Sequence, residues 1–287
     1  MYEPRWIHPK TTADAAAALA EEPGRARPVA GATDLAVHIR ASHDGPETLV
    51  DLTCVDELAA VRVDGGRLSI GAAATHALVA EHPVVGERAA VLAQACGTVG
   101  APQIRARGTI GGNIANASPA ADATVALVAL DAVATLVSAR GERDIPVAEL
   151  FTGPGSTVLE PDELLTRVGF DLPGDEATSV YRKVGQRKAL AIAIASVAAT
   201  YDPATGAVRI ALGSVAPTII RATGAEAVFA AGGDVMELIG AAAAEAARAS
   251  SPIDDVRASA EYRAILVEEL TRTALEELVL AGPRVSG

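Results

Sequence analysis

The stretch from Arg107 to Asp122, RGTIGGNIANASPAAD, contains the residues best suited to bind a charged group. Its paired glycines, Gly111 and Gly112, allow positive φ and lack the Cβ atoms that would keep a ligand from the backbone N–H groups. Such N–H groups can hold an anion. The simpler interpretation is a tight loop in which the glycines only relieve strain. The stretch matches neither G-x-G-x-x-G nor G-x-x-x-x-G-K-[ST], so the two commonest nucleotide fingerprints do not apply.

A helix is expected directly after these glycines. Ser118 can cap it, Pro119 suits its first position, and residues 120–134 are apolar with Asp122 in the first turn. Because free N–H groups and the positive end of the helix dipole meet at such a start, a glycine turn feeding a helix favours phosphate binding.

A second junction of this kind, in which a turn of small residues leads into a helix, lies earlier in the chain. Residues 28–35, PVAGATDL, predict a short strand that enters a turn of small residues, followed by a helix over 36–40. Two such junctions could grip two phosphates. Thr33 and Asp34 have an alternative role as caps of that helix.

The composition excludes some classes of partner. The 287 residues are 50% hydrophobic and 3% aromatic, and the formal net charge of −12 opposes a large phosphate-neutralising surface, so nucleic acid is not expected as a partner. Residues 1–10 contain no apolar run, and the longest such run, 189–195, is far shorter than the ~20 residues of a spanning helix. We expect a soluble, cytoplasmic protein without membrane insertion.

Little acid–base or metal chemistry is indicated. Cys54 and Cys96 form no C-x-x-C pair and are expected to be buried thiols; His76 has no second histidine at a metal-binding spacing, so no metal site and no catalytic side chain are predicted. No G-x-S-x-G motif is present. A phosphate cradle without acid–base residues points to a bound cofactor that performs the chemistry.

The sequence pattern changes at 173–176, PGDE, which is the best candidate boundary between domains. Before it we expect a capped helix after Thr11 and a hairpin around Asp64-Gly65-Gly66. Beyond it, residues 190–201 and 207–215 predict an antiparallel hairpin, followed by helices over 224–231, 234–249 and 259–280.

Both junctions resemble the two FAD-pyrophosphate segments of the molybdenum hydroxylase flavoproteins, the medium, FAD-binding subunits of xanthine dehydrogenase, carbon monoxide dehydrogenase and aldehyde-oxidising relatives. The resemblance rests on AGATDL at 30–35 and on TIGGN at 109–113 with SPAAD at 118–122. Further stretches in family order extend it over essentially the whole chain; they are LVDL at 49–52, IGA at 70–72, VGAPQIR at 99–105, YRKVGQR at 181–187 and PIDDVR at 252–257.

The resemblance implies an α+β fold: a two-part FAD-binding domain of the p-cresol methylhydroxylase type over 1–174, with subdomains of about 1–53 and 54–174, then a C-terminal α+β domain over 175–287. It implies FAD as the cofactor. The contacts carried over from the family are Val29, Ala30, Gly31, Ala32, Thr33, Asp34, Leu35, Thr75, His76, Val99, Gly108, Thr109, Gly111, Gly112, Asn113, Ala115, Asn116, Asp122, Leu164, Leu165 and Lys183. Among them, Asp122 resembles a carboxylate that fixes flavin-side hydroxyls, and Leu164, Leu165 and Lys183 resemble positions that line the isoalloxazine.

The chain departs from the family pattern at Ala32, where a second glycine is usual. Either φ stays negative there, or this segment lies farther from the phosphate. By resemblance, a molybdopterin-binding large subunit and a [2Fe–2S] small subunit must come from other chains, in a dimer of heterotrimers. Two other functions remain open: a stand-alone flavin oxidoreductase of the same fold, such as the class that reduces UDP-sugar enolpyruvate, and a non-catalytic nucleotide-binding or assembly module.

Overall fold

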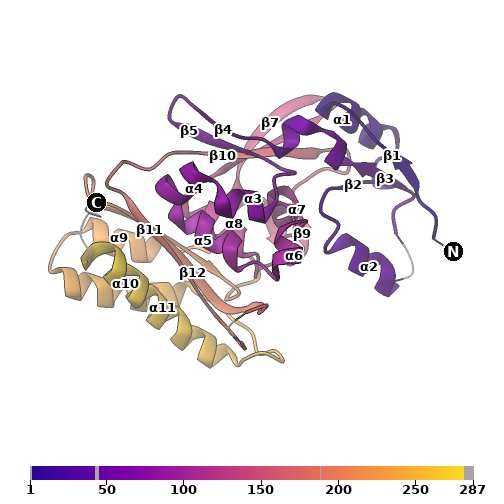
Figure 1. The fold of residues 1–287 in the computed structure, drawn as a ribbon. Coiled ribbons are helices and arrows are strands. Elements are labelled where there is room, and N and C mark those ends of the chain that lie inside the picture. Colours follow the sequence, from indigo (N-terminus) through magenta and orange to yellow (C-terminus); the bar gives the residue numbers. More distant parts are fainter. Residues whose placement is uncertain (1, 43–44, 188, 281–287) are drawn as a thin grey trace.

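A computed structural model describes residues 2–42, 45–187 and 189–280 of the chain (Figure 1). An N-terminal sheet with α2 lies on one side of the molecule and α9 to α11 lie on the other, with α3 to α8 between them. The mixture of helices and largely antiparallel sheets confirms the α+β class. Among the described residues no helix is both long and apolar enough to cross a membrane.

The first sheet is parallel, with strands in the order β1-β3-β2. Its elements are β1 (Arg5–Ile7), α1 (Thr12–Glu21), β2 (Ala26–Val29), α2 (Leu35–Ser42) and β3 (Thr48–Asp51). The hydroxyl of Thr11 accepts a hydrogen bond from the N–H of Asp14, which confirms the predicted cap. Since parallel strands need a crossover, α1 and α2 each connect two strands, and the ends of β1, β2 and β3 come together at one edge.

The second sheet is antiparallel, in the order β4-β5-β10-β6-β7. Its strands are β4 (Val61–Asp64), β5 (Arg67–Gly71), β6 (Val133–Ser138), β7 (Gly141–Pro146) and β10 (Leu164–Asp171). The predicted hairpin is confirmed: β4 pairs with β5 through Gly65 and Gly66, whose φ values of +54° and +83° need glycine. Short elements complete this part, namely η1 (Leu52–Cys54), η2 (Asp56–Ala59), η3 (Val147–Glu149), β8 (Phe151–Gly153) and β9 (Ser156–Thr157).

A layer of short helices lies between this sheet and the C-terminal one (Figure 1). It comprises α3 (His76–Glu81), α4 (Pro83–Arg88), α5 (Ala90–Thr98), α6 (Pro102–Arg105), α7 (Ile110–Ala115) and α8 (Asp122–Ala129). The helix expected over 120–134 is shorter, because α8 begins at Asp122 and the chain turns through Asp131, at φ +52°, into β6. Ser118 does not cap it; its hydroxyl accepts from the N–H of Ala120.

The C-terminal sheet is covered on both faces. It has the order β11-β12-β13-β14, with β11 (Thr178–Gly185), β12 (Ala193–Asp202), β13 (Ala207–Gly213) and β14 (Ile220–Arg221), and the predicted hairpin is confirmed by the pairing of β12 with β13. Along β12, Ala195 and Val197 join the core beneath α9 (Thr223–Ala230), α10 (Val235–Ala249) and α11 (Ala260–Leu280), whereas Ala198 joins the core shared with α5 and α8. Both faces of β12 are therefore apolar and buried.

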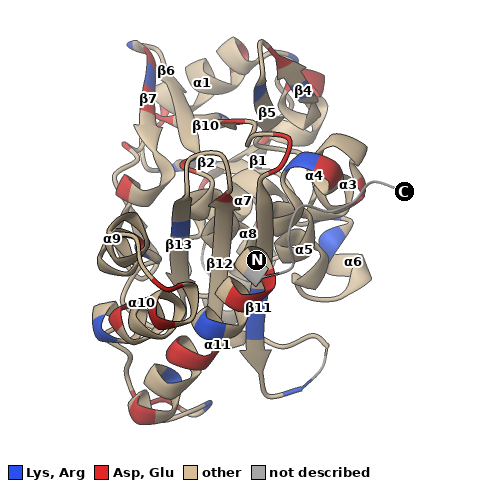
Figure 2. Ribbon diagram, turned by 90° about the vertical axis from the view of Figure 1, so that its left-hand side faces the viewer, with Lys and Arg blue, Asp and Glu red and all other residues tan. Residues whose placement is uncertain are grey.

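That shared core crosses the predicted boundary at 173–176, since Tyr181, Ala198 and Ala211 belong to the same apolar cluster as Leu68 and Phe170. The division into 1–174 and 175–287 stays a prediction. On the outer surface, acidic and basic residues are interspersed along α10 and α11 (Figure 2).

Candidate cofactor-binding site

One pocket collects most of the predicted cofactor residues. It lies where β2 ends, where α2 and α7 begin, and beside α3. The predicted residues that line it are Val29, Ala30, Gly31, Ala32, Thr33, Asp34, Leu35, His76, Val99, Gly108, Thr109, Gly112, Asn113, Ala115 and Asn116. The two junctions, far apart in sequence, therefore form facing walls of one site.

Four lining residues escaped the sequence analysis: Arg27, Pro28, His38 and Ile104. Arg27 and Pro28 directly precede the predicted segment, and His38 lies one helical turn beyond Asp34, so a helical projection of 34–38 could have found it.

The turn at 30–34 presents an unusual run of unused backbone donors. Among the described residues, no acceptor takes a hydrogen bond from the N–H groups of Ala30, Gly31, Ala32, Thr33 or Asp34. These residues are half-buried or exposed, so water can pair with their N–H groups, and consecutive free donors beside a pocket at the start of a helix are also suited to an anion. Neither Thr33 nor Asp34 uses its side chain to cap α2 within the described part of the chain.

The geometry of this turn depends on two positions. Ala32 adopts φ +58°, the left-handed conformation that favours glycine, so the alternative of a negative φ at this position is wrong, and the alternative of a longer distance to the phosphate stays a prediction. At Gly31 a Cβ would overlap the carbonyl oxygen of Arg107. Glycine at 31 therefore lets the first junction pack directly on the backbone of the second.

The backbone N–H groups at 110–113 are already engaged within the protein, and the predicted contact of 109–113 with the pyrophosphate stays a prediction. The N–H of Ile110 donates to the carbonyl of Ala74 at 2.9 Å, that of Gly111 to the carbonyl of Ala72 at 2.8 Å, and those of Gly112 and Asn113 donate to Thr109. Neither Gly111 nor Gly112 has positive φ, because both lie inside α7. Gly111 is required for packing: a Cβ there would sit 2.5 Å from the Cβ of Ala72.

Side chains of α7 still offer donors to the pocket. The Oδ1 atom of Asn113 accepts hydrogen bonds from the N–H and the hydroxyl of Thr124, at 3.2 and 2.9 Å. This leaves the amide NH2 of Asn113 without an acceptor among the described residues. Thr109 Oγ1 accepts from Gly112, and its own proton is similarly available.

His76 forms a neutral part of the wall. Its side chain is 2% exposed, and its Nδ1 atom has no hydrogen-bond partner in the described structure. Burial, with a smaller contribution from the charge of Arg105, lowers the pKa of His76 to about 4. Its backbone N–H donates to the carbonyl of Gly108 at 2.9 Å, which ties α3 to the second junction.

Asp122 and Lys183 lie together, outside this pocket. Lys183 Nζ is 2.6 Å from Asp122 Oδ2, and the hydroxyl of Tyr181 donates to Asp122 Oδ1 at 2.6 Å. Burial raises the pKa of Asp122, opposed by the adjacent ammonium of Lys183. Since both carboxylate oxygens are already engaged, the predicted contact of Asp122 with flavin hydroxyls is not supported by this arrangement, and the sequence analysis missed Tyr181.

Lys183 lines a second, larger cavity of about 1060 Å³ together with residues 97–98, 100–103, 105, 181–187 and 189–191. Its predicted place beside the isoalloxazine stays a prediction. Leu164 and Leu165 reach neither pocket: they are 2% and 4% exposed, in two different apolar clusters. Thr75 caps α3 by accepting from the N–H of Leu78 and pairs with Thr109 in an isolated bridge. Contacts of these three residues with the cofactor also stay predictions.

Comparison with known proteins gives consistent matches. Residues 2–173 match the family described as FAD binding domain in molybdopterin dehydrogenase, and residues 180–278 match the carbon monoxide dehydrogenase flavoprotein C-terminal domain. The chain is 31% identical over 276 residues to the xanthine dehydrogenase FAD-binding subunit of Escherichia coli O157:H7, with 94% of each chain covered. It is 37% identical over 169 residues to the nicotinate dehydrogenase FAD-subunit of Eubacterium barkeri, a match that spans 58% of this chain and 57% of the relative.

Solved structures agree. The carbon monoxide dehydrogenase of Hydrogenophaga pseudoflava contains a chain that superposes with a TM-score of 0.92 at 30% identity, covering 98% of this chain and 100% of that one. A chain of quinoline 2-oxidoreductase from Pseudomonas putida 86 superposes with a TM-score of 0.90 at 27% identity, covering 98% of each.

Proposed function

Because the chain belongs to the family of FAD-binding medium subunits of molybdenum hydroxylases, and is therefore a subunit of an FAD-dependent oxidoreductase, we propose that it relays electrons within a multi-subunit enzyme. It accepts electrons from a [2Fe–2S] subunit and passes them to an external acceptor. The partners are that small subunit and a molybdopterin-binding large subunit, assembled as a dimer of heterotrimers in the cytoplasm.

The observation that carries the proposal is the run of five unused N–H groups at 30–34, which fits the pyrophosphate of FAD. In this proposal these donors bind the phosphate oxygens, and the hydroxyl of Thr109 and the amide of Asn113 approach from the facing wall. His76, which lines the pocket, stays neutral at physiological pH. Bound FAD supplies electron exchange in one-electron or two-electron steps.

The chain cannot hold an iron–sulfur cluster alone. A [2Fe–2S] cluster takes four ligands, whereas the sequence contains two cysteines, of which Cys96 is fully buried. Burial raises the pKa of the Cys96 thiol, so it stays protonated and is a poor ligand. We therefore assign the cluster to another chain, and the relatives' names, medium chain and FAD-subunit, support this assignment.

Purification of the chain alone tests the proposal. We expect one noncovalent FAD per chain, released into the supernatant by acid precipitation, and no turnover of a purine, an aldehyde or carbon monoxide. Co-expression with iron–sulfur and molybdopterin subunits should restore turnover. If the flavin-loaded chain alone oxidised such a substrate at ~1–10³ s⁻¹, the stand-alone oxidoreductase would replace the relay. A chain without bound flavin would instead indicate an assembly module.

A further inference from the structure

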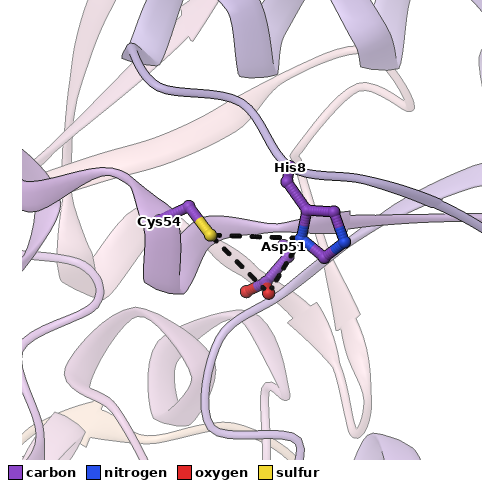
Figure 3. Close-up of side chains that lie close together, drawn as sticks. All are labelled: His8, Asp51 and Cys54. Carbon is purple, nitrogen blue, oxygen red and sulfur yellow. Dashed lines mark hydrogen bonds and ion pairs between the residues drawn. The ribbon is translucent and has the colours of Figure 1, made fainter.

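Three side chains of different chemistry meet at the edge where β1 and β3 end: His8, Asp51 and Cys54 (Figure 3). His8 Nδ1 is 3.3 Å from Asp51 Oδ2, and Cys54 Sγ is 4.0 Å from His8 Nδ1 and 3.9 Å from Asp51 Oδ2. The site is separate from the FAD pocket, which these residues do not line. Cys54 is half-buried, so the expectation of a buried thiol is wrong for it.

The fold brings these residues together by register. β1 and β3 are parallel neighbours with Ile7 opposite Val50, so the next residues along the two strands, His8 and Asp51, lie side by side. After Asp51 the chain enters η1, and Cys54 follows three residues later. Because side chains three apart are eclipsed in a 3₁₀ turn, Cys54 returns to the same face as Asp51.

Both partners of His8 approach the same ring nitrogen. In a cysteine nucleophile with a histidine base, the thiol and the carboxylate engage opposite nitrogens of the ring. One ring nitrogen then accepts the thiol proton while the N–H of the other nitrogen donates to the carboxylate. Here Cys54 Sγ and Asp51 Oδ2 both face Nδ1. This arrangement cannot relay a proton from Cys54 to Asp51 through the ring, and instead directs three donor atoms toward one point.

The triangle has nearly the size that a zinc ion requires. Tetrahedral zinc with bonds of about 2.0 Å to N and O and about 2.3 Å to S places N and O about 3.3 Å apart and S about 3.5 Å from each. The His8–Asp51 separation of 3.3 Å already matches. The sulfur has to move by only about 0.5 Å.

The surroundings orient the donors. Asp51 Oδ1 accepts from the N–H of Thr53 at 2.9 Å and from its hydroxyl at 2.6 Å, which holds the carboxylate and leaves Oδ2 for another partner. The ring of His8 stacks on Trp6, with centroids 6.2 Å apart. Outer contacts of this kind fix the ligands of metal sites.

We propose that His8, Asp51 and Cys54 form a zinc site with three protein ligands and a fourth position open to solvent. One thiolate, one imidazole and one carboxylate form a donor set that suits Zn²⁺ and excludes the hard cations Mg²⁺ and Ca²⁺. His8 is more than half exposed, so an ion can enter from solvent.

Titration of the tag-free, full-length, reduced protein with Zn²⁺ in a calorimeter tests the site, with Co²⁺ difference spectra as a second probe. We expect one ion per chain and a cobalt–thiolate charge-transfer band. Asp51→Asn is the sharpest variant, because its retained Oδ1 still caps η1 while an NH2 replaces the ligand oxygen. Asp51→Asn, Cys54→Ala and His8→Gln should each weaken Zn²⁺ binding by roughly tenfold or more.

Two matched controls remove the same chemistry elsewhere: Asp56→Asn, an exposed carboxylate two residues from Cys54, and Cys96→Ala, the other thiol. Both should bind Zn²⁺ like the unaltered chain, and thermal melts confirm that every variant is folded. The proposal is overturned if the unaltered chain takes up no stoichiometric ion, if the three ligand variants bind as tightly as it does, or if the controls lose binding equally.

Discussion

The two strand–turn–helix junctions of the pocket look alike in sequence but use their backbones differently. At 30–34 five N–H groups are unused and Ala32 accepts a left-handed conformation, whereas at 110–113 every N–H is bonded within the protein. The glycine-rich segment uses its N–H groups for bonds within the protein, whereas the segment with fewer glycines leaves its N–H groups free and is the binding turn that we propose. Glycines thus mark close packing as readily as ligand binding, and only an account of the hydrogen bonds distinguishes the two.

The largest effect is expected at Asp122, which lies outside the pocket and is engaged by Lys183 and Tyr181. Asp122→Ala leaves the ammonium of Lys183 and the hydroxyl of Tyr181 without their acceptor, and we expect a loss of about 3–5 kcal/mol of stability, measured by urea unfolding of the FAD-free protein. The double variant Asp122→Asn/Lys183→Met should recover part of it. Weakened FAD binding at unchanged stability would instead return Asp122 to the cofactor.

A pH effect is expected at His76, which ties α3 to the second junction. The unfolded chain protonates this histidine below a pKa of 6.5, but the folded chain does so only near its lowered pKa of about 4. Stability should therefore be lost as pH falls from 6.5 to 4, by about 3 kcal/mol in total. Unfolding measured across this range should show a shallower decline in His76→Phe, which keeps a ring but cannot titrate; equal slopes would show that another group is responsible.

Gly31→Ala is expected to push the first junction, at 30–34, away from the backbone of the second. Its Cβ meets the backbone of Arg107, which cannot move as a side chain could, so we expect a cost of about 1–3 kcal/mol and FAD affinity reduced about tenfold or more, measured by flavin fluorescence titration. Gly86→Ala is the matched control, because its Cβ meets nothing within 4 Å. Normal FAD affinity in Gly31→Ala would mean that contact between the junctions is unimportant for binding.

The smallest effect is expected at Ala32. Ala32→Gly relieves a left-handed alanine, worth about 1–2 kcal/mol, but adds the backbone entropy of glycine in the unfolded chain, so the net gain should be about 0.5–1 kcal/mol. Thermal unfolding measures it. Ala30→Gly, where φ is not positive, should lose stability, and a loss in Ala32→Gly as well would argue against the left-handed turn.

Much of the fold could be predicted from sequence because local signals sufficed. The cap at Thr11, the Gly65-Gly66 turn and the hairpin of β12 and β13 each depend on neighbouring residues. The residues alone indicated the two junctions, but most of the pocket's lining could be named only from a family resemblance, since residues 30–34 and 108–116 meet through tertiary packing.

The contacts that the sequence analysis did not predict have the same origin. The carbonyls of Ala72 and Ala74, which accept from the N–H groups of Gly111 and Ile110, lie more than thirty-five residues before them. Tyr181, which engages Asp122, lies 59 residues beyond it. The site at His8, Asp51 and Cys54 depends on strand register, which sequence spacing does not reveal.

Amide hydrogen exchange with and without FAD tests the central distinction most directly. With FAD bound, the amides of 30–34 should change from fast to slow exchange, because the pyrophosphate supplies the acceptors they lack. The amides of 110–113 should exchange slowly in both states, since carbonyls of the protein already protect them. Protection gained at 110–113 with no change at 30–34 would contradict the assignment of the binding turn.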